Sequence, residues 1–432
     1  MQFLQREMSS ILSETVKQRP LVYLNGPRQV GKSWLSRNFA SPKDTNFISF
    51  DSPLVLMNAK SSPEAFVRSL PKDKLNVIDE VQMAPEIFMP LKIAVDEARM
   101  RGESWGQFLL TGSANLMAIP ALSEALVGRM AILTLWQISS SEYKQSGINF
   151  IEKLFDDELF YKKYDNYELL GIMANSTFPE LSKQSVQAQG VFGFAEDSVS
   201  SRINRSTWFD GYLTTILQRD VKTVANIRKP ENVLKLLTVL TIYAGSILNN
   251  TNAARESELH FDTYNDYKSF LINTFLIYEL RAWTKPNRIG KMVSRQSKLF
   301  FTDTNLLLYI MRRELKDVSN HDRPMMGHLF ENFIATEIIK NKSSLTGMDL
   351  SYFRTSDGRE VDFVLEKYNG DTIGIEVKLD SMLSEKDFRG LKVLKSMVGE
   401  KFKKGVVIYS GNEILSFGNG MWAVPVCYLW WG

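Results

Sequence analysis

The stretch Leu21-Val-Tyr-Leu-Asn-Gly-Pro-Arg-Gln-Val-Gly-Lys-Ser33 places a short apolar run directly before a loop with two glycines and a lysine. Gly26, four further residues and then Gly31-Lys32-Ser33 have the P-loop spacing, in which backbone N–H groups surround the phosphates of a nucleotide. The pattern requires a strand before the loop and a helix after it, and both are predicted here. We therefore expect ATP to bind the loop and the residue that follows it: Gly26, Pro27, Arg28, Gln29, Val30, Gly31, Lys32, Ser33 and Trp34.

The end of this loop and a later pair of acids predict metal-assisted hydrolysis. Lys32 would reach the β- and γ-phosphates, and Ser33 would hold Mg²⁺. Asp79 and Glu80 end a second apolar run that begins at Leu75. Asp79 would bind the same Mg²⁺, and Glu80 would polarise the attacking water. The alternative is an ordinary surface Asp-Glu pair.

A third strand-like run, Gln107-Phe-Leu-Leu-Thr111, ends in polar residues. Thr111, Ser113 and Asn115 are candidates for sensing the γ-phosphate, and we include Ser113 among the nucleotide-binding residues. A polar turn after a core strand is an equally good interpretation.

Arg129 follows Gly128 and precedes another apolar run. An arginine at this place would stabilise transition-state charge on the nucleotide of a neighbouring subunit, and the chain would then form a homo-oligomer. An ordinary salt-bridged surface arginine is the alternative.

Composition limits the classes of function. The chain has 432 residues, enough for two to four domains, and its 44% hydrophobic and 23% charged residues are typical of a globular protein. The net charge of +3 gives no overall basic field, so nucleic acid would need local patches. One cysteine, Cys427, and three histidines argue against disulfides and against Cys- or His-based metal sites. Since we find neither a membrane-spanning run nor a signal-peptide core, we expect a cytoplasmic protein without a membrane partner.

The N-terminal part alternates apolar runs with helical segments, which predicts a parallel α/β sheet with its ligand at the carboxyl ends of the strands. The pattern then becomes helical, as expected of a lid. The predicted strands are 21–25, 46–51, 75–79, 107–111 and 131–135. We assign residues 1–149 to this domain and 150–228 to the lid.

Residues 229–318 predict a different unit. Helical patterns at 234–244, 251–258 and 262–275 precede two strands, 280–290 and 297–302, which is the order of a winged helix. The loop between the strands and its flanks are basic and would contact nucleic-acid phosphates, with DNA favoured over RNA. A winged helix used only for packing is the alternative. The basic residues are Lys285, Arg288, Lys291, Arg295 and Lys298.

Residues 319–432 carry a second set of acids. Helical spacing aligns Glu331 with an apolar stripe, and two alternating runs, 359–365 and 372–379, predict a hairpin. If Val361, Phe363 and Leu365 are buried together with the apolar set of the second strand, Asp362 and Glu376 share the opposite face with Lys378. This pairing requires an odd-length loop or a bulge.

Two carboxylates and a lysine on one face predict a site for a hard cation. Asp362 and Glu376 would hold Mg²⁺ or Mn²⁺, Lys378 would orient water or stabilise phosphate charge, and Glu331 would assist from the helix. A charged solvent face of a surface hairpin is the alternative.

As an ordered set, these motifs resemble an uncharacterised family of prokaryotic P-loop ATPases. The resemblance implies an α/β fold with an AAA+-type parallel sheet domain and helical lid, then a winged helix and a PD-(D/E)xK nuclease-like α/β domain. Asn305 replaces an expected glycine, and Phe178-Pro-Glu lacks the usual preceding glycines. The residues that carry the resemblance are 26–33, Asp79-Glu80, Thr111-Gly-Ser113, Gly128-Arg129, Arg219-Asp220, Asp303-Thr-Asn305, Glu331, Glu360-Val-Asp362 and Glu376-Val-Lys378.

The resemblance leaves two hypotheses of function. The first is an ATP-driven protein that acts on nucleic acid, with a metal-dependent nuclease-like centre in which Glu331, Asp362, Glu376 and Lys378 are catalytic. The second is a nucleotide switch or assembly ATPase whose C-terminal domains bind protein partners and cleave nothing.

Overall fold

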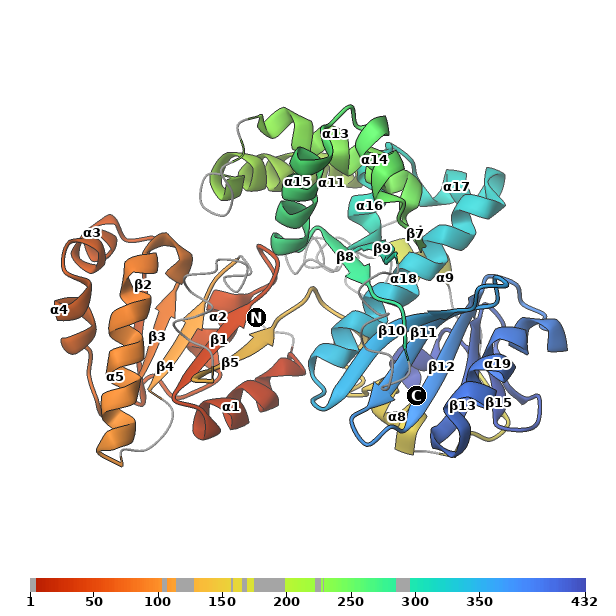
Figure 1. Ribbon diagram of the computed structural model, residues 1–432, viewed down its shortest axis with the longest axis horizontal. Helices are drawn as coiled ribbons and strands as arrows, with labels where there is room; N and C mark the ends of the chain where they lie inside the picture. Colours follow the sequence, from red (N-terminus) through yellow and green to blue (C-terminus); the bar gives the residue numbers. More distant parts are fainter. Residues whose placement is uncertain are drawn as a thin grey trace.

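The computed structural model describes residues 5–102, 107–113, 128–156, 158–164, 169–174, 199–221, 227, 229–284 and 296–432. Three parts are visible in Figure 1: a sheet domain at the left, a group of helices at the top, and a second sheet domain at the right. The long helix α18 (Arg323–Ser343) passes from the upper helices into the second sheet domain.

The N-terminal domain is a five-stranded parallel sheet in the order β2-β3-β4-β1-β5, which confirms the predicted α/β architecture. The predicted and observed strands differ by at most two residues at either end. The elements are α1 (Met8–Gln18), β1 (Leu21–Asn25), α2 (Lys32–Asn38), β2 (Thr45–Ser49), α3 (Pro53–Ser61), α4 (Pro63–Arg68), β3 (Leu75–Asp79), η1 (Val81–Met83), η2 (Pro85–Ile87), α5 (Phe88–Met100), β4 (Phe108–Thr111) and β5 (Met130–Thr134).

Strand β1 is buried on both faces because helices cover both sides of the sheet. Leu21 and Tyr23 pack into a core with α4 and α5, whereas Val22 and Leu24 pack into a second core with α1. This alternation is what a strand with two covered faces requires. The carboxyl end of β1 therefore emerges at a fixed edge of the sheet, where the P-loop begins.

The segment predicted as a lid, residues 150–228, packs partly on the C-terminal domain and partly on the upper helices. Helix α8 (Phe150–Asp156) packs on α18 and β13, and β6 (Lys162–Lys163) pairs with β14 of the C-terminal sheet. Helix α11 (Val199–Thr215) and the π-helical turn η4 (Ile216–Asp220) contact instead the helices α13 and α16. The segment also contains the short helix α9 (Leu169–Ala174), and α7 (Ser140–Lys144) precedes the segment. Within the described residues, 150–228 thus do not form one unit.

The next part, which we call the three-helix module, comprises residues 230–301. Three helices and a small antiparallel sheet in the order β7-β9-β8 form this part, with β7 between the first and second helices and β8 and β9 after the third. The order of three helices followed by two strands agrees with the prediction, but the strand predicted at 280–290 lies at Ile277–Leu280. The elements are α13 (Pro230–Leu240), η5 (Thr241–Tyr243), β7 (Ser246–Ile247), α14 (Asn250–Glu256), α15 (Phe261–Asn273), β8 (Ile277–Leu280) and β9 (Lys298–Phe301).

The C-terminal domain is a seven-stranded mixed sheet in the order β10-β11-β12-β13-β15-β14-β6. Helix α18 covers one face and α19 the other. The remaining elements are α16 (Thr304–Met311), α17 (Leu315–His321), β10 (Met348–Arg354), β11 (Glu360–Lys367), β12 (Thr372–Lys378), η7 (Glu385–Phe388), α19 (Arg389–Val398), η8 (Gly399–Lys401), β13 (Phe402–Tyr409), β14 (Glu413–Ser416), β15 (Met421–Pro425) and α20 (Tyr428–Trp431).

The β11–β12 hairpin confirms the parity argument. Glu366 pairs with Thr372, and the loop closes with Lys367 N–H donating to Asp371 O at 2.9 Å, so that the loop has an odd length. The prediction that Val361, Phe363 and Leu365 lie on one face is only partly correct, because the pairing of β11 with β10 shifts by one residue. Val361 joins the α19 core whereas Phe363 joins the α18 core. A bulge at Asp362 explains this, since an extra residue turns the following side chain to the other face.

None of the helices within the described ranges has both the length and the apolar character needed to cross a membrane.

Candidate functional site

The P-loop lies at the carboxyl edge of the parallel sheet in a conformation that requires glycine. Gly26 has φ 141° and Gly31 φ 95°, values that residues with a side chain rarely adopt. A Cβ on Gly26 would also lie 2.1 Å from the Leu135 carbonyl oxygen, at the end of the neighbouring strand. The loop is thus packed directly against the sheet, and α2 begins at its end, with Lys32.

Lys32 is buried beneath this loop. Its Nζ donates to the Gly26 carbonyl at 2.9 Å and to the Pro27 carbonyl at 2.5 Å. Burial lowers the pKa of Lys32 to about 8, although the negative charge of Glu80 opposes this effect. The ammonium group therefore lies within the concavity that the sequence predicts for phosphate.

Asp79, at the end of β3, connects this strand with β4 and helix α2. Its Oδ1 accepts a hydrogen bond from Ser33 Oγ at 3.0 Å and another from Thr111 Oγ1. A serine hydroxyl beside a carboxylate is a donor set suited to Mg²⁺, which prefers oxygen ligands. The residues present therefore fit the predicted magnesium ion, and Thr111 holds the carboxylate from β4.

Glu80 follows Asp79 in a left-handed backbone conformation, with φ 58°. Gln82 Nε2 donates to the Glu80 carboxylate and, at 3.2 Å, to Ser113 Oγ. Gln82 thus joins the proposed water-polarising acid to a residue predicted to sense phosphate. We did not predict this role of Gln82, because a glutamine two residues after an acid carries no distinctive signal.

Arg28, within the P-loop, forms a buried ion pair with Asp220. Its Nε lies 2.6 Å from Asp220 Oδ2, and a second hydrogen bond joins the guanidinium to Oδ1. The neighbouring Arg219 lies 3.0 Å from Asp51, after β2. The resemblance singled out Arg219 and Asp220 without giving their partners. The structure brings both to the nucleotide-binding edge, through η4.

Arg6, near the N-terminus, binds the opposite side of the P-loop. It donates to the Val30 carbonyl at 2.8 Å and the Trp136 carbonyl at 2.7 Å, and it pairs with Glu142 at 3.0 Å. Two residues before Glu142, Ser140 N–H donates at 2.7 Å to Glu337 of α18. We call Arg6, Glu7, Glu142 and Glu337 the buried junction.

The buried junction therefore connects the P-loop with the main helix of the C-terminal domain. Glu337 is itself buried and pairs with Lys340 at 2.9 Å. Buried ion pairs are costly to break, because the remaining charge has no partner. Val30 is thus joined to α18 through Arg6, Glu142 and the hydrogen bond from Ser140 N–H to Glu337.

Glu7 makes this junction sensitive to pH. Burial raises its pKa from 4.5 to about 7, and the charges of Glu142 and Glu337 add to the effect, whereas Ser141 and Arg6 oppose it. Because the folded chain holds this proton more tightly than the unfolded chain, the free energy of unfolding should fall as the pH rises from about 4.5 to 7. In thermal unfolding, the melting temperature of Glu7→Gln relative to the wild type should rise over this range and then level off.

The matched control is Glu14→Gln, at an exposed position of α1, the helix that follows Glu7. The pH dependence of the Glu7→Gln difference is read relative to this variant. A Glu7→Gln difference that follows the control over the whole range would show that Glu7 keeps its charge when folded.

Arg129 lies at the amino end of β5, the edge of the sheet opposite the P-loop. Its Nε is 2.6 Å from Asp96 Oδ1 on α5, and about a third of its side chain is exposed. Within one chain it therefore contributes nothing at the phosphate edge. The ion pair with Asp96 agrees with the alternative of an ordinary salt-bridged arginine. If Arg129 contacts a nucleotide at all, that nucleotide must be bound to a neighbouring subunit.

The acids of the C-terminal domain gather around a lysine from another part of the chain. Lys298 Nζ lies 3.0 Å from Glu331, 2.5 Å from Glu360 and 2.8 Å from Asp362, and the residue is only 2% exposed. We predicted that Lys298 is one of the basic residues that contact nucleic-acid phosphates. This prediction is wrong, because Lys298 points from β9 into the acids instead of into solvent.

Asp362, Glu376 and Lys378 lie close enough for the charge of Asp362 to act on both of the other groups. Gly374 faces Leu391 and Leu394 of α19, so the alternation of β12 directs Glu376 and Lys378 to that side, where they pair at 2.7 Å. Asp362, at the bulge, contacts Lys298 and accepts from Val377 N–H at 2.9 Å. Sequence alternation could not reveal the bulge at Asp362.

Electrostatics still couple these groups. Burial, and then the charge of Asp362, raise the pKa of both Glu331 and Glu376. Glu376 Oε2 is buried without a hydrogen-bond partner among the described residues. No group of three or more His, Cys, Asp or Glu side chains in the described ranges is arranged to hold a metal ion. The acids therefore do not fit the predicted Mg²⁺ or Mn²⁺, since an ammonium group occupies their centre.

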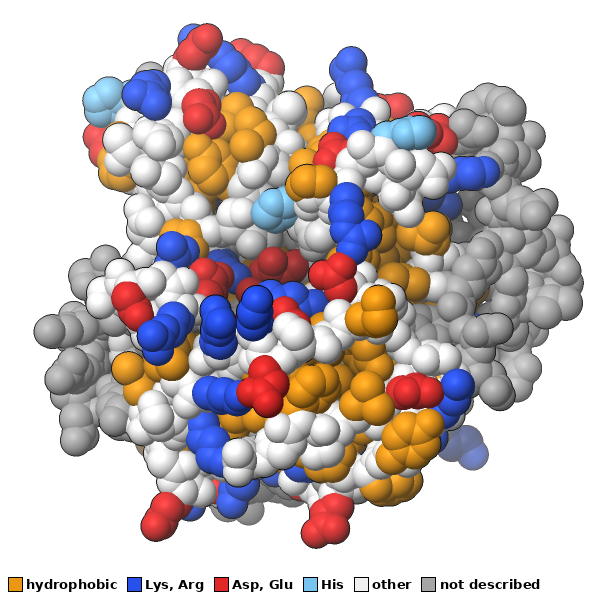
Figure 2. Space-filling view, turned by 90° about the vertical axis from the view of Figure 1, so that its right-hand side faces the viewer, with side chains coloured by type: hydrophobic (Ala, Val, Ile, Leu, Met, Phe, Trp, Pro, Cys, Tyr) orange, Lys and Arg blue, Asp and Glu red, His pale blue; other side chains and the backbone are white. Residues whose placement is uncertain are grey.

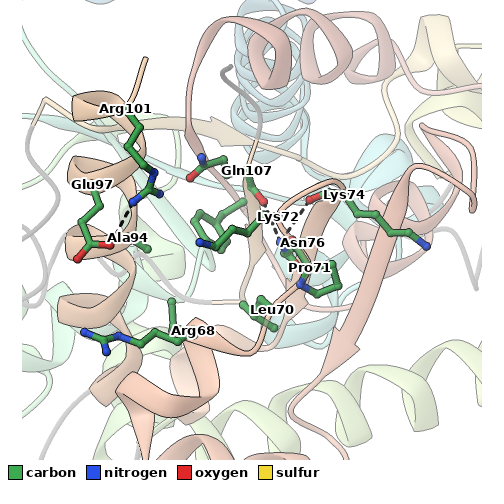
Figure 3. A pocket seen from close by; sticks show the side chains of 12 residues that line it. Arg68, Leu70, Pro71, Lys72, Lys74, Asn76, Ala94, Glu97, Arg101 and Gln107 are labelled. Carbon is green, nitrogen blue, oxygen red and sulfur yellow. Dashed lines mark hydrogen bonds and ion pairs between the residues drawn. The ribbon is translucent and has the colours of Figure 1, made fainter. Parts of the chain in front are cut away.

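A separate cavity of about 320 Å³ lies at the amino edge of the N-terminal sheet, away from the P-loop (Figure 3). Apolar side chains form part of its wall, and Arg68, Lys72, Lys74 and Arg101 contribute basic groups. Arg68 pairs with Glu64 and Arg101 with Glu97, so part of this charge is already compensated. The cavity belongs to neither predicted centre.

Several predicted residues cannot be placed. Asn115 and the basic residues Lys285, Arg288, Lys291 and Arg295 lie outside the described residues. Trp34 is described, partly exposed at the start of α2.

Three family models match successive parts of the chain. Residues 18–144 match a family described as an AAA domain. Residues 193–317 and 326–429 match two domains of unknown function, DUF8612 and DUF4143. Uncharacterised proteins of Mycobacterium bovis and Mycobacterium tuberculosis, Mb2031c and Rv2008c, are each 24% identical over 97% of this chain and 83% of their own length.

Among solved structures, a single-residue variant of RuvB from Thermotoga maritima aligns with 63% of this chain and 87% of its own, at 20% identity and a TM-score of 0.28. Pif1 helicase from Bacteroides, solved with ADP-AlF3 and ssDNA, aligns with 46% of this chain and 58% of its own, at 15% identity and a TM-score of 0.24. At such scores these alignments carry no argument. Residues 18–144 are thus similar to AAA domains, and the geometry of the phosphate edge agrees with a P-loop at this place.

Proposed function

We propose that this chain binds and hydrolyses ATP at the carboxyl edge of its N-terminal sheet. The observation that carries the proposal is the convergence of Lys32, Ser33 and Asp79 beneath a glycine-dependent loop, with Glu80 beside them. Phosphate release from ATP by the purified full chain, with Mg²⁺ and with EDTA, tests it. Turnover that is absent with Mg²⁺, or equal in EDTA, would contradict the proposal.

The side chains divide the work of hydrolysis. Lys32 would exchange its carbonyl contacts in the loop for contacts with phosphate oxygens, and Ser33 and Asp79 would hold Mg²⁺. That ion, when bound, neutralises charge on the phosphates. Gln82 would position Glu80, which would accept a proton from the attacking water. Thr111 would keep Asp79 in place.

We further propose that the nucleotide state reaches the other domains by two routes. Arg28 lies in the phosphate loop and binds Asp220, so a phosphate group near Arg28 would compete for its guanidinium. On the opposite side, the buried junction joins Val30 to α18. Both contacts support a role in which ATP turnover moves the three-helix module and the C-terminal domain relative to the sheet.

The target of this movement is proposed to be nucleic acid, with DNA favoured. One support is the order of helices and strands in the three-helix module, which is that of a winged helix. The other is the set of basic residues between β8 and β9 in the sequence, namely Lys285, Arg288, Lys291 and Arg295. Each lysine or arginine that contacts phosphate contributes about 0.9 to the slope of log affinity against log salt concentration.

Replacing all four residues by serine should therefore weaken DNA binding and reduce this slope, measured by fluorescence anisotropy with single- and double-stranded DNA and RNA. The matched control replaces four exposed basic residues of the N-terminal domain, Lys17, Arg19, Lys43 and Lys60, which removes the same charge. An equal effect in both variants would mean that only net charge matters. Absence of binding to any nucleic acid would exclude this target.

The homo-oligomer is also part of the proposal. Since Arg129 is distant from its own P-loop, it would act only on the nucleotide of a neighbour and would have to leave Asp96 to do so. Sedimentation velocity with and without ATP tests the assembly, and a monomer with full turnover would exclude it.

Metal-dependent cleavage at Glu331, Asp362, Glu376 and Lys378 receives less support. Because the acids surround Lys298, we derive no cleavage step from them. The same observation favours the alternative in which the C-terminal domain is a non-catalytic interaction module driven by the ATPase. Cleavage of plasmid or single-stranded DNA by the wild type, lost in Glu376→Ala, would reverse this preference.

A further inference from the structure

We propose that Lys298 is the resident cation of the C-terminal acid centre, and that this centre locks the three-helix module to the C-terminal sheet. In this role the centre holds an ammonium group in place of a divalent ion. The inference does not depend on ATP hydrolysis, because it concerns residues at the other end of the chain.

The first support is the origin of the charged groups. Lys298 belongs to β9 of the three-helix module, Glu331 to α18, and Glu360 and Asp362 to β11 of the C-terminal sheet. Three ion pairs of 2.5–3.0 Å thus connect three elements that are distant in sequence. A set of contacts within a single element would only stabilise that element, whereas this set fixes one part of the chain on another.

The second support is that the neighbouring contacts hold β9 in register with the C-terminal domain. Asn332, next to Glu331, accepts from Phe301 N–H at 2.8 Å and donates to the Phe301 carbonyl at 3.1 Å. Beyond β8, Trp283 N–H donates to Tyr352 O at 2.6 Å, and Tyr352 N–H donates to Arg281 O at 2.9 Å. Contacts on both sides of Lys298 therefore hold its strand against the C-terminal domain and direct the side chain into the acids.

The third support is the charge balance. Four carboxylates share three cations here, because Lys298 pairs with Glu331, Glu360 and Asp362, Arg354 also pairs with Glu360, and Lys378 pairs with Glu376. Burial opposes the charged form of Lys298, but the charges of Asp362, Glu331 and Glu360 outweigh it and raise the pKa of this lysine. An ammonium group so placed is retained, because removing it would leave several buried carboxylates unpaired.

The surface around this region has the same mixed character. Figure 2 shows basic and acidic side chains together in the hollow between the upper helices and the C-terminal domain below. A centre built to hold divalent ions needs several carboxylates free to coordinate metal. Here, carboxylates that would do so are already paired with lysines.

The metal part of the proposal can be tested without disturbing Lys298. Binding of Mn²⁺ to the nucleotide-free full chain is followed by the electron paramagnetic resonance signal of the free ion, in the wild type and in Asp362→Asn. We expect the two titrations to be identical, because Asp362 binds Lys298 and not the metal. A loss of one bound Mn²⁺ in Asp362→Asn would overturn the proposal.

The locking role is tested by hydrogen–deuterium exchange of Lys298→Met against Lys268→Met. Lys268 pairs with Glu279 at 2.8 Å inside the three-helix module and is the matched control. Lys298→Met should increase exchange at least tenfold in β9 and also in β11. Lys268→Met should affect only α15 and β8. Unchanged exchange in β11 of Lys298→Met would contradict the lock.

If Lys298→Met does not fold, Lys298→Arg and the combination Lys298→Met with Asp362→Asn and Glu331→Gln decide the matter. The first keeps the charge and the second removes the unpaired acids, so both should yield more folded protein than Lys298→Met alone. Equal losses in all three would show that the packing of β9, and not its charge, is responsible.

Discussion

Replacing Lys32 by alanine is expected to abolish measurable ATP binding at nucleotide concentrations that saturate the wild type. The side chain is buried under the P-loop, and its Nζ lies within hydrogen-bonding distance of the Gly26 and Pro27 carbonyls. A hydrogen bond to a charged group contributes about 1.5–3 kcal/mol, so losing contacts to two phosphates should weaken binding by about 100-fold or more. Isothermal titration calorimetry with ATP and Mg²⁺ measures the difference.

The control for this result is Lys60→Ala, which removes an exposed lysine from α3. It should bind ATP like the wild type. Thermal unfolding of both variants without nucleotide separates loss of the site from loss of the fold. A folded Lys32→Ala variant with ordinary ATP affinity would mean that nucleotide binds elsewhere.

The Glu80→Gln variant should keep ATP affinity and lose turnover. Glutamine preserves the size of the side chain but cannot accept the proton of the attacking water, a contribution of roughly 10²–10⁴-fold. Because Gln82 Nε2 would then face an amide, the contact that positions residue 80 should also weaken. Steady-state phosphate release and ATP binding are measured on the same preparation.

Glu86→Gln, at an exposed position of η2, is the matched control and should turn over ATP at the wild-type rate. If Glu80→Gln hydrolyses ATP as fast as this control, Glu80 is not the base. A parallel loss of binding in Glu80→Gln would instead assign it a structural role.

The features that depend on short-range spacing could be predicted from the sequence. The P-loop, the strand before it and the Asp79-Glu80 pair occupy a few consecutive residues, so local pattern and backbone geometry suffice. The odd-length loop of the β11–β12 hairpin followed from parity alone. In each case the information lies within one or two neighbouring elements.

The features that depend on tertiary partners could not be predicted. Arg28 and Asp220 are 192 positions apart, and nothing in either segment indicates the other. Lys298 looked like one basic residue among several in a loop, and its burial follows only from how β9 meets α18. The bulge at Asp362 is also invisible to alternation, because the sequence reads as an uninterrupted strand.

The pairing of β6 with β14 has a practical consequence for dividing this protein into fragments. Residues 162–163 precede the three-helix module in the chain, yet they complete the edge of the seven-stranded sheet, and α8 packs on α18 and β13 of the same domain. A fragment that starts at residue 319 would leave β14 with unpaired backbone groups and expose the surface that α8 covers. Open edges of this kind promote aggregation, so soluble expression of the final sheet should require residues 150–164 to be supplied as well.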